Sequence, residues 1–310
     1  MAGLCEGRVA IVTGAGRGVG REHALLLAAN GARVVVNDLG ANVDGTGQDA
    51  SFASQTVADI RKAGGEAMVN GDDVSSWAGA KNMIDSALKA YGKLDIVVNN
   101  AGILRDRMLV NMSEEEWDAV IRVHLKGTFA PSRHAAAYWR ELQKTTGEPV
   151  MGRIINTTST SGIYGNVGQT NYGAAKAGIA AFTIIAAREL KRIGVTVNAI
   201  SPSAQTRMTE GLRVVNDEQR AMRDPKWVSP RGHLPGERTG PGHHGPRDPG
   251  RRRAHRRVRR LAARRGSAAG DRSGRGRQVA ARDAAESPKE LGHGRPGTGL
   301  RTQWRSITTT

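Results

Sequence analysis

The chain has 310 residues, of which 38% are apolar and only 4% aromatic, so it fits two average domains or one α/β domain with an extension. Its 46 Lys and Arg outnumber 29 Asp and Glu, and its one cysteine excludes an internal disulfide framework. Neither a secretory leader pattern nor a run of about 18 apolar residues occurs, which favours a cytoplasmic protein and disfavours a membrane one.

Between residues 8 and 201, short β-branched runs alternate with longer helical periods, the pattern of βαβ units around a parallel sheet. Six strands are predicted, at Val9–Thr13, Arg33–Asn37, Ala67–Asn70, Asp95–Asn99, Arg153–Thr158 and Val195–Ile200. Helices are predicted to begin near Gly18, Ser51, Ser76, Ser113, Thr128 and Asn171. Strands such as VAIVT and VVVN are apolar throughout, so helices should cover both faces of the sheet. The predicted fold class is α/β, a Rossmann-like doubly wound parallel sheet within residues 1–230.

The first predicted strand runs directly into a glycine-rich turn, which also opens the first helix. Glycine lets backbone approach a pyrophosphate and take dihedral angles that a Cβ forbids, while the N–H groups of the helix hold the anion. The candidate cofactor contacts in the turn are Gly14, Gly16, Arg17, Gly18, Val19 and Gly20. A tight turn with a purely structural role is the alternative.

Asp38 ends the second strand, 18 positions after Gly20, close to the offset of about 20 at which an acid accepts the ribose hydroxyls. A carboxylate there repels a 2′-phosphate, which favours NAD over NADP, although Arg17 would moderate that preference. Further candidates stand at the ends of the third and fourth strands, with turn formation as the alternative. They are Asp73, Val74, Asn100, Ala101 and Gly102.

The segment Tyr172-Gly173-Ala174-Ala175-Lys176, with Ser159 thirteen positions earlier, completes a recognisable set. Together with the glycine turn and Asn99–Gly102, it resembles the short-chain dehydrogenase/reductase family over about residues 5–215. Tyr172 and Lys176 share a helix face, and a neighbouring ammonium is expected to lower the pKa of the phenol toward neutrality. The resemblance implies that Tyr172 takes the proton of a substrate hydroxyl, that Lys176 also holds the nicotinamide ribose, and that Ser159 binds the substrate oxygen.

Two further residues carry roles that only the resemblance implies. Thr206, in the loop after the sixth strand, is expected to contact the cofactor. The family usually has Asn where this chain has His124. That asparagine is thought to anchor a water molecule in a proton relay from the lysine. Histidine also donates and accepts hydrogen bonds, and a histidine packed for shape is the alternative. No metal site is predicted.

His124 and the segments Asn37–Gly40, Asn100–Asp106 and Gly162–Asn166 resemble one branch of the family. That branch contains the dehydrogenase region of peroxisomal multifunctional β-oxidation enzymes. It implies NAD-dependent interconversion of a secondary alcohol and a ketone, on a 3-hydroxyacyl-CoA or hydroxysteroid substrate. Homo-oligomers of the family's kind are also implied.

The composition changes near Ser229 and Pro230, and residues 231–310 form an Arg-, Gly- and Pro-rich tail. These 80 positions hold 20 basic residues, 19 of them Arg, against 6 acids, and only 7 of Ile, Leu, Val, Met and Phe. Such a segment cannot bury a core and is predicted to be disordered. Nothing in it resembles the last strand of the family, and a shifted reading frame would explain the change.

The tail leaves two alternative functions open. One is a dehydrogenase impaired by the loss of its last strand, which would also weaken oligomer formation. The other is nucleic-acid binding through the arginine clusters. The second is disfavoured, because single-strand binders interleave aromatic side chains and the tail has only Trp304.

Overall fold

A computed structural model of the chain describes residues 3–202, 225 and 228. Four expectations fall outside these residues: the cofactor contact Thr206, the boundary after residue 230, the basic tail 231–310 and the loss of the last strand. No helix in the described part of the chain is long and apolar enough to cross a membrane.

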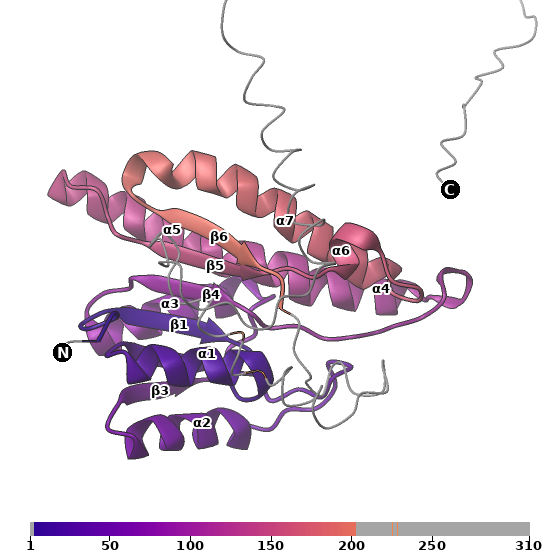
Figure 1. The fold of residues 1–310 in the computed structure, drawn as a ribbon, viewed down its shortest axis with the longest axis horizontal. Coiled ribbons are helices and arrows are strands. Elements are labelled where there is room, and N and C mark those ends of the chain that lie inside the picture. Colours follow the sequence, from indigo (N-terminus) through magenta and orange to yellow (C-terminus); the bar gives the residue numbers. More distant parts are fainter. Residues whose placement is uncertain (1–2, 203–224, 226–227, 229–310) are drawn as a thin grey trace, which may run out of the picture. The chain divides into compact units, whose positions relative to one another are not determined.

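Six parallel strands form one sheet in the order β3-β2-β1-β4-β5-β6 (Figure 1). The strands are β1 (Val9–Thr13), β2 (Arg33–Asn37), β3 (Glu66–Asn70), β4 (Ile96–Asn99), β5 (Arg153–Thr157) and β6 (Thr196–Ile200). The order reverses between β1 and β4, and open α/β sheets bind ligands at this switch point, beyond the carboxyl ends of the strands. The predicted Rossmann-like fold class is confirmed.

Helices cover both faces of the sheet (Figure 1). They are α1 (Gly18–Ala29), α2 (Ser51–Lys62), α3 (Trp77–Tyr91), α4 (Glu114–Ile121), α5 (Gly127–Thr146), α6 (Ser161–Tyr164) and α7 (Thr170–Leu190). On one face, α1 and α2 bury Leu27 and Ile60 against Val34. On the other, α3 and α5 bury Met83 and Trp139, and α7 packs its Ala186 into the same cluster. Burial on both faces explains why the strands read as continuous apolar runs.

Two of the six predicted helix starts have side-chain caps, at Ser76 and Ser113. Ser76 accepts a hydrogen bond from the Gly79 N–H and begins α3. Ser113 and Glu116 form a reciprocal capping box at α4. Each predicted strand is present, with bounds that differ by at most one residue. For example, β4 begins at Ile96, although the backbone of the preceding Asp95 still bonds Val9 O and the Arg153 N–H at 2.9 Å each. The Asp95 carboxylate also accepts a hydrogen bond from the Val9 N–H at 2.8 Å.

Three short elements were not predicted. These are the 3-10 turns Leu109–Asn111 and Lys191–Ile193 and the π-helical turn Arg122–Lys126, which joins α4 to α5. The four-residue helix α6 was not predicted either. A π turn adds one residue to a helix without a composition signal of its own, and such turns are frequent at functional sites. Here the added turn contains His124.

Candidate active site

The glycine turn and Asp38 lie side by side because β1 and β2 end together, with Thr13 opposite Asn37. The Asp38 carboxylate accepts one hydrogen bond from the Gly16 N–H at 2.8 Å and another from the Gly40 N–H at 2.7 Å. Each oxygen is thereby oriented and keeps acceptor capacity for a further hydroxyl. This arrangement fits two ribose hydroxyls of a dinucleotide.

The turn itself is shaped by contacts that leave no room for side chains. A Cβ on Gly16 would lie 2.9 Å from Asp38 Oδ2, and one on Gly14 would lie 2.8 Å from Ala101 Cα. Gly14 also has a φ of +63°, in the left-handed region. At the start of α1, Arg17 occupies the N-cap position without capping the helix through its side chain. The N–H groups of a helix start of this kind suit a pyrophosphate, while Gly18 and half-buried Val19 continue the turn into the helix.

Arg17 points toward the loop that follows β2. Its guanidinium carbon lies 3.5 Å from the centroid of the Phe52 ring, and its NH2 nitrogen donates to Ala41 O at 2.8 Å. The same loop contains Gly40, which holds Asp38. The sequence predicts that the Arg17 side chain moderates the preference for NAD. In the structure this side chain instead contacts Phe52 and Ala41 of the protein itself.

Thr13 and Asn100 join the turn to the end of β4. The Thr13 hydroxyl accepts hydrogen bonds from the N–H groups of Asn100 and Ala101 at 2.9 and 3.1 Å. The Asn100 side-chain amide donates to Thr13 O at 3.1 Å and Gly14 O at 3.2 Å. Asn100 and Ala101 therefore lie beside the glycine turn.

The two candidates after β3 are held by the protein itself. Asp73 accepts hydrogen bonds from the Ser75 N–H and hydroxyl at 2.8 and 2.7 Å, the turn-forming alternative that its position left open. The Val74 side chain is buried in the core, and a Cβ on Gly127 would lie only 2.8 Å from it. Within this structure, both residues shape the end of β3 rather than present free side chains.

Ser159, Tyr172 and Lys176 come together at the carboxyl end of β5. Tyr172 and Lys176 lie on the first turns of α7, with the Lys176 Nζ 5.5 Å from the centroid of the Tyr172 ring. Ser159 hydrogen-bonds the Tyr172 side chain. Lys176 is buried, and its Nζ donates to Thr157 O, the last residue of β5, at 2.7 Å. The predicted group of three is therefore assembled, and it follows the strand next to β4.

The expected lowering of the Tyr172 pKa is wrong for this structure. Burial raises the pKa of the Tyr172 phenol above its ordinary value, and the Asp106 carboxylate adds to this rise, while the hydrogen bond with Ser159 opposes it. The expected ammonium is weakened because burial also lowers the pKa of Lys176 to about 7. At pH 7 a lysine with this pKa is about half protonated, so less positive charge is present to stabilise a phenolate than an ordinary lysine would supply.

His124 is buried and lies edge-on to Tyr172, with ring centroids 5.1 Å apart. Its Nε2 is 2.8 Å from Ile103 O and 3.1 Å from Ile103 N. Its Nδ1 is buried without a hydrogen-bond partner among the described residues. Burial, with a smaller contribution from the Lys176 charge, lowers the pKa of His124 to about 3, so the ring is neutral. The ring fits only because position 102 is glycine, where a Cβ would lie 2.3 Å from His124 Cε1.

Two polar residues beside the motifs were not predicted as part of the site. Thr13 is 1% exposed and joins the glycine turn to β4; Asn171 is fully buried directly before Tyr172. In the sequence, each is only a polar residue next to a motif. That position does not show whether the side chain is buried or exposed. The described residues contain no group of three or more His, Cys, Asp or Glu placed to hold a metal ion.

Comparison with known proteins agrees with this geometry. Residues 8–217 match the family described as short chain dehydrogenase, and the chain belongs to that family. It is 52% identical over 205 residues to "Hydroxyacyl-CoA dehydrogenase ChsB1" of Mycobacterium tuberculosis, a match that covers 66% of this chain and 63% of the relative. It is 51% identical over 207 residues to "Peroxisomal multifunctional enzyme type 2" of Drosophila melanogaster, covering 67% of this chain and 33% of the relative.

A solved structure supports the same assignment. A crystal structure of a short chain dehydrogenase from Mycobacterium avium is similar with a TM-score of 0.66 and 46% identity, covering 84% of this chain and 96% of that chain. The predicted family and its branch are confirmed. The sequence match nevertheless spans less than two thirds of the length of the two relatives named above.

The buried Lys176 leads to a prediction about stability. Its pKa of about 7 in the folded chain lies well below the ordinary 10.5. Between these values the unfolded chain binds more protons, so folding stability rises with pH, by about 2 kcal/mol between pH 7 and pH 9. Urea unfolding at pH 7, 8 and 9 should show this rise for the wild type and a smaller one for Lys176→Met. Parallel pH curves for the two proteins would contradict the assignment of a depressed lysine pKa.

Proposed function

We propose that this chain is an NAD-dependent oxidoreductase that interconverts a secondary alcohol and a ketone on a 3-hydroxyacyl-CoA or hydroxysteroid substrate. The observation that carries the proposal is the group of Ser159, Tyr172 and Lys176 at the carboxyl end of β5, on the same edge of the sheet as the glycine turn. The hydroxyacyl-CoA dehydrogenase and multifunctional enzyme among its relatives support the substrate class. We also propose a cytoplasmic location, in keeping with a single, buried thiol at Cys5.

In the proposed mechanism, a bound nicotinamide dinucleotide supplies the hydride acceptor or donor. Asp38 holds the adenosine ribose, and the N–H groups of the glycine turn hold the pyrophosphate. Ser159 donates a hydrogen bond to the substrate oxygen and keeps it close to the Tyr172 hydroxyl. The raised pKa of Tyr172 keeps the phenol protonated, which suits proton donation to a ketone oxygen.

In the direction of alcohol oxidation, Tyr172 first loses its own proton, and the resulting phenolate then accepts the proton of the substrate hydroxyl. Lys176 in its protonated form stabilises the phenolate by its charge, and it holds the nicotinamide ribose. His124 stays neutral, so its buried Nδ1 acts as a hydrogen-bond acceptor if Nε2 carries the proton and donates to Ile103 O. That acceptor is suited to a water molecule on the path by which the proton leaves Tyr172.

The experiment that tests the proposal is an initial-rate assay with NAD and with NADP. The substrates are 3-hydroxyacyl-CoAs of several chain lengths and a set of hydroxysteroids, with the ketones and NADH in the reverse direction. We expect turnover with NAD on at least one of the two substrate classes. Tight NADH binding without turnover of either class would instead favour an impaired dehydrogenase.

The position of Asp38 leads to a prediction about the relative affinities for NADH and NADPH. Asp38→Ser removes a carboxylate that bonds the N–H groups of Gly16 and Gly40, and hydrogen bonds to a charged group contribute about 1.5–3 kcal/mol each. We expect NADH affinity to fall about 10- to 30-fold and NADPH affinity to rise, measured by fluorescence titration. The control is Asp85→Asn, which breaks an exposed ion pair with Lys81 on α3 and should change neither affinity. An unchanged ratio of the two affinities in Asp38→Ser would contradict the role of Asp38.

A further inference from the structure

The Asn171 side chain is fully buried at the first turn of α7, directly before Tyr172. Its Oδ1 accepts a hydrogen bond from the Tyr172 N–H at 2.7 Å. Its Nδ2 donates to Arg105 O at 2.9 Å and to Glu116 O at 3.2 Å. Both amide protons and one lone pair are thus used, so the planar carboxamide is held at three points.

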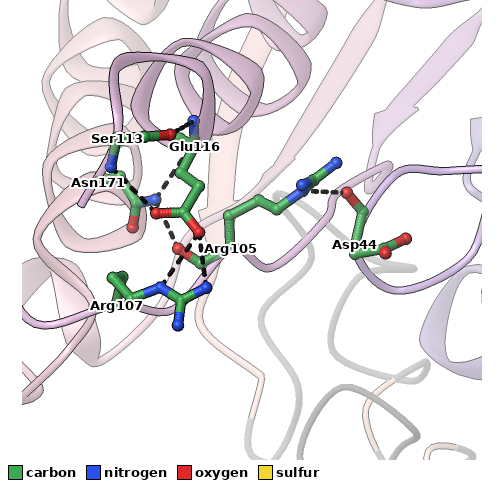
Figure 2. A network of polar contacts seen from close by, with 6 residues as sticks. All are labelled: Asp44, Arg105, Arg107, Ser113, Glu116 and Asn171. Carbon is green, nitrogen blue, oxygen red and sulfur yellow. Dashed lines mark hydrogen bonds and ion pairs between the residues drawn. The ribbon is translucent and has the colours of Figure 1, made fainter. Parts of the chain in front are cut away.

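The partners of Asn171 come from two segments that are distant from α7 in sequence (Figure 2). Arg105 lies in the loop after β4, and its Nε also donates to Asp44 O in the loop after β2. Glu116 lies in the first turn of α4, where its carboxylate accepts hydrogen bonds from the Ser113 N–H and from Arg107. The amide therefore joins α7 to both the β4 loop and α4.

The first turn of α7 has few other ways to satisfy these groups. Gln169 occupies the N-cap position and makes no side-chain cap, and the first N–H groups of a helix have no partner within the helix. Without the Asn171 amide, the Tyr172 N–H and the Arg105 carbonyl lose this partner at a part-buried site. The Glu116 carbonyl loses one partner and keeps its hydrogen bond within α4. Unpaired buried polar groups are costly, so the turn is expected to shift until they find new partners.

We propose that Asn171 is a positioning residue for the reaction: it fixes the Tyr172 phenol relative to Ser159 by tying the start of α7 to the β4 loop and to α4. The inference rests on the proposed function, in which Tyr172 carries the proton. The Asn171 side chain contacts neither the Tyr172 hydroxyl nor the Ser159 hydroxyl, since its partners are all backbone groups. It acts through the backbone of Tyr172, and through the segment that carries Arg105.

A second connection keeps α7 in place when Asn171 is changed. The Gln169 side chain donates to Asp106 Oδ2 at 2.7 Å, and the Arg107 N–H donates to Gly168 O at 2.8 Å. The chain before α7 thus stays attached to the β4 loop in an Asn171 variant. We therefore expect a folded protein in which the first turn of α7 is displaced.

The test compares Asn171→Ala with wild type by steady-state kinetics, NADH titration and thermal melting. A displacement of 1 Å in a reacting group costs roughly 100-fold in rate, and for a smaller shift we expect kcat to fall about 30-fold. The KM for the alcohol and the Kd for NADH should change less than about 3-fold, because the binding contacts remain. Trp139→Phe is the matched control. It removes a buried hydrogen bond of 2.7 Å to Leu94 O, before the start of β4, and should lower Tm while leaving kcat unchanged.

The outcomes separate this inference from the proposed function. If Asn171→Ala keeps kcat within about 3-fold of wild type while Tyr172→Phe is inactive, the positioning role is wrong and the proposed function stands. If Tyr172→Phe is itself active, both are wrong. If the alanine protein does not fold, Asn171→Ser takes its place, since a hydroxyl can accept one hydrogen bond and donate one. A kcat between wild type and Tyr172→Phe supports the inference, and a wild-type kcat overturns it.

Discussion

Replacement of Tyr172 by Phe is expected to lower kcat about 10³- to 10⁴-fold in both directions of the proposed reaction. General acid–base catalysis by a placed side chain contributes about 10²- to 10⁴-fold, and here Ser159 hydrogen-bonds the hydroxyl that the variant lacks. The phenyl ring keeps its contact with His124, so the packing around the site should change little. NADH binding and Tm should therefore stay near their wild-type values while stopped-flow or steady-state rates collapse.

The control for this variant makes the same chemical change at a remote site. Tyr91→Phe removes a phenol hydroxyl at the end of α3, where the ring lies against Arg33. It should leave kcat unchanged. Turnover by Tyr172→Phe within about 10-fold of wild type would contradict the assignment of the proton to this phenol.

The fold could be predicted from the sequence because its signals are local and repeated. A β-branched apolar run marks each central strand, and Ser76 and Ser113 mark two helix starts through their caps. Parallel strands buried on both faces require helices between them, so the layer arrangement follows. The relative positions of Gly16 and Asp38 then follow from the register of β1 and β2.

What the sequence could not predict depends on burial and on contacts between distant segments. The reversal of the Tyr172 pKa shift arises from desolvation of both Tyr172 and Lys176, whereas spacing along a helix shows only that they are neighbours. The space for His124 depends on the π turn and on Gly102. The role proposed for Asn171 depends on carbonyls that lie 66 and 55 positions away in sequence. None of these leaves a periodic pattern.

Gly20→Ala is expected to weaken NADH binding about 100-fold or more. A Cβ at this position would lie 2.1 Å from Gly14 O and 2.5 Å from Asn100 Nδ2. These two atoms form a hydrogen bond of 3.2 Å that joins the glycine turn to the end of β4. Since Gly20 does not have a left-handed φ, alanine fits its backbone dihedral angles and the variant tests the clash alone. Relief of the clash requires a shift of the Gly14 carbonyl, and the turn would then lose the shape that holds a pyrophosphate.

The matched control separates a loss of binding from a loss of stability. Overpacking at Gly20 costs about 1–3 kcal/mol in folding free energy. Gly7→Ala has a similar expected cost of about 1–2 kcal/mol, because Gly7 has a φ of +68°, which disfavours alanine. No atom lies within 4 Å of a Cβ added to Gly7, so this cost includes no clash. Urea unfolding should therefore show comparable losses for the two variants, while fluorescence titration should show weak NADH binding only for Gly20→Ala. A folded Gly20→Ala protein that binds NADH as wild type does would place the cofactor elsewhere than on this turn, and the mechanism built on Asp38 and Tyr172 would have to be abandoned.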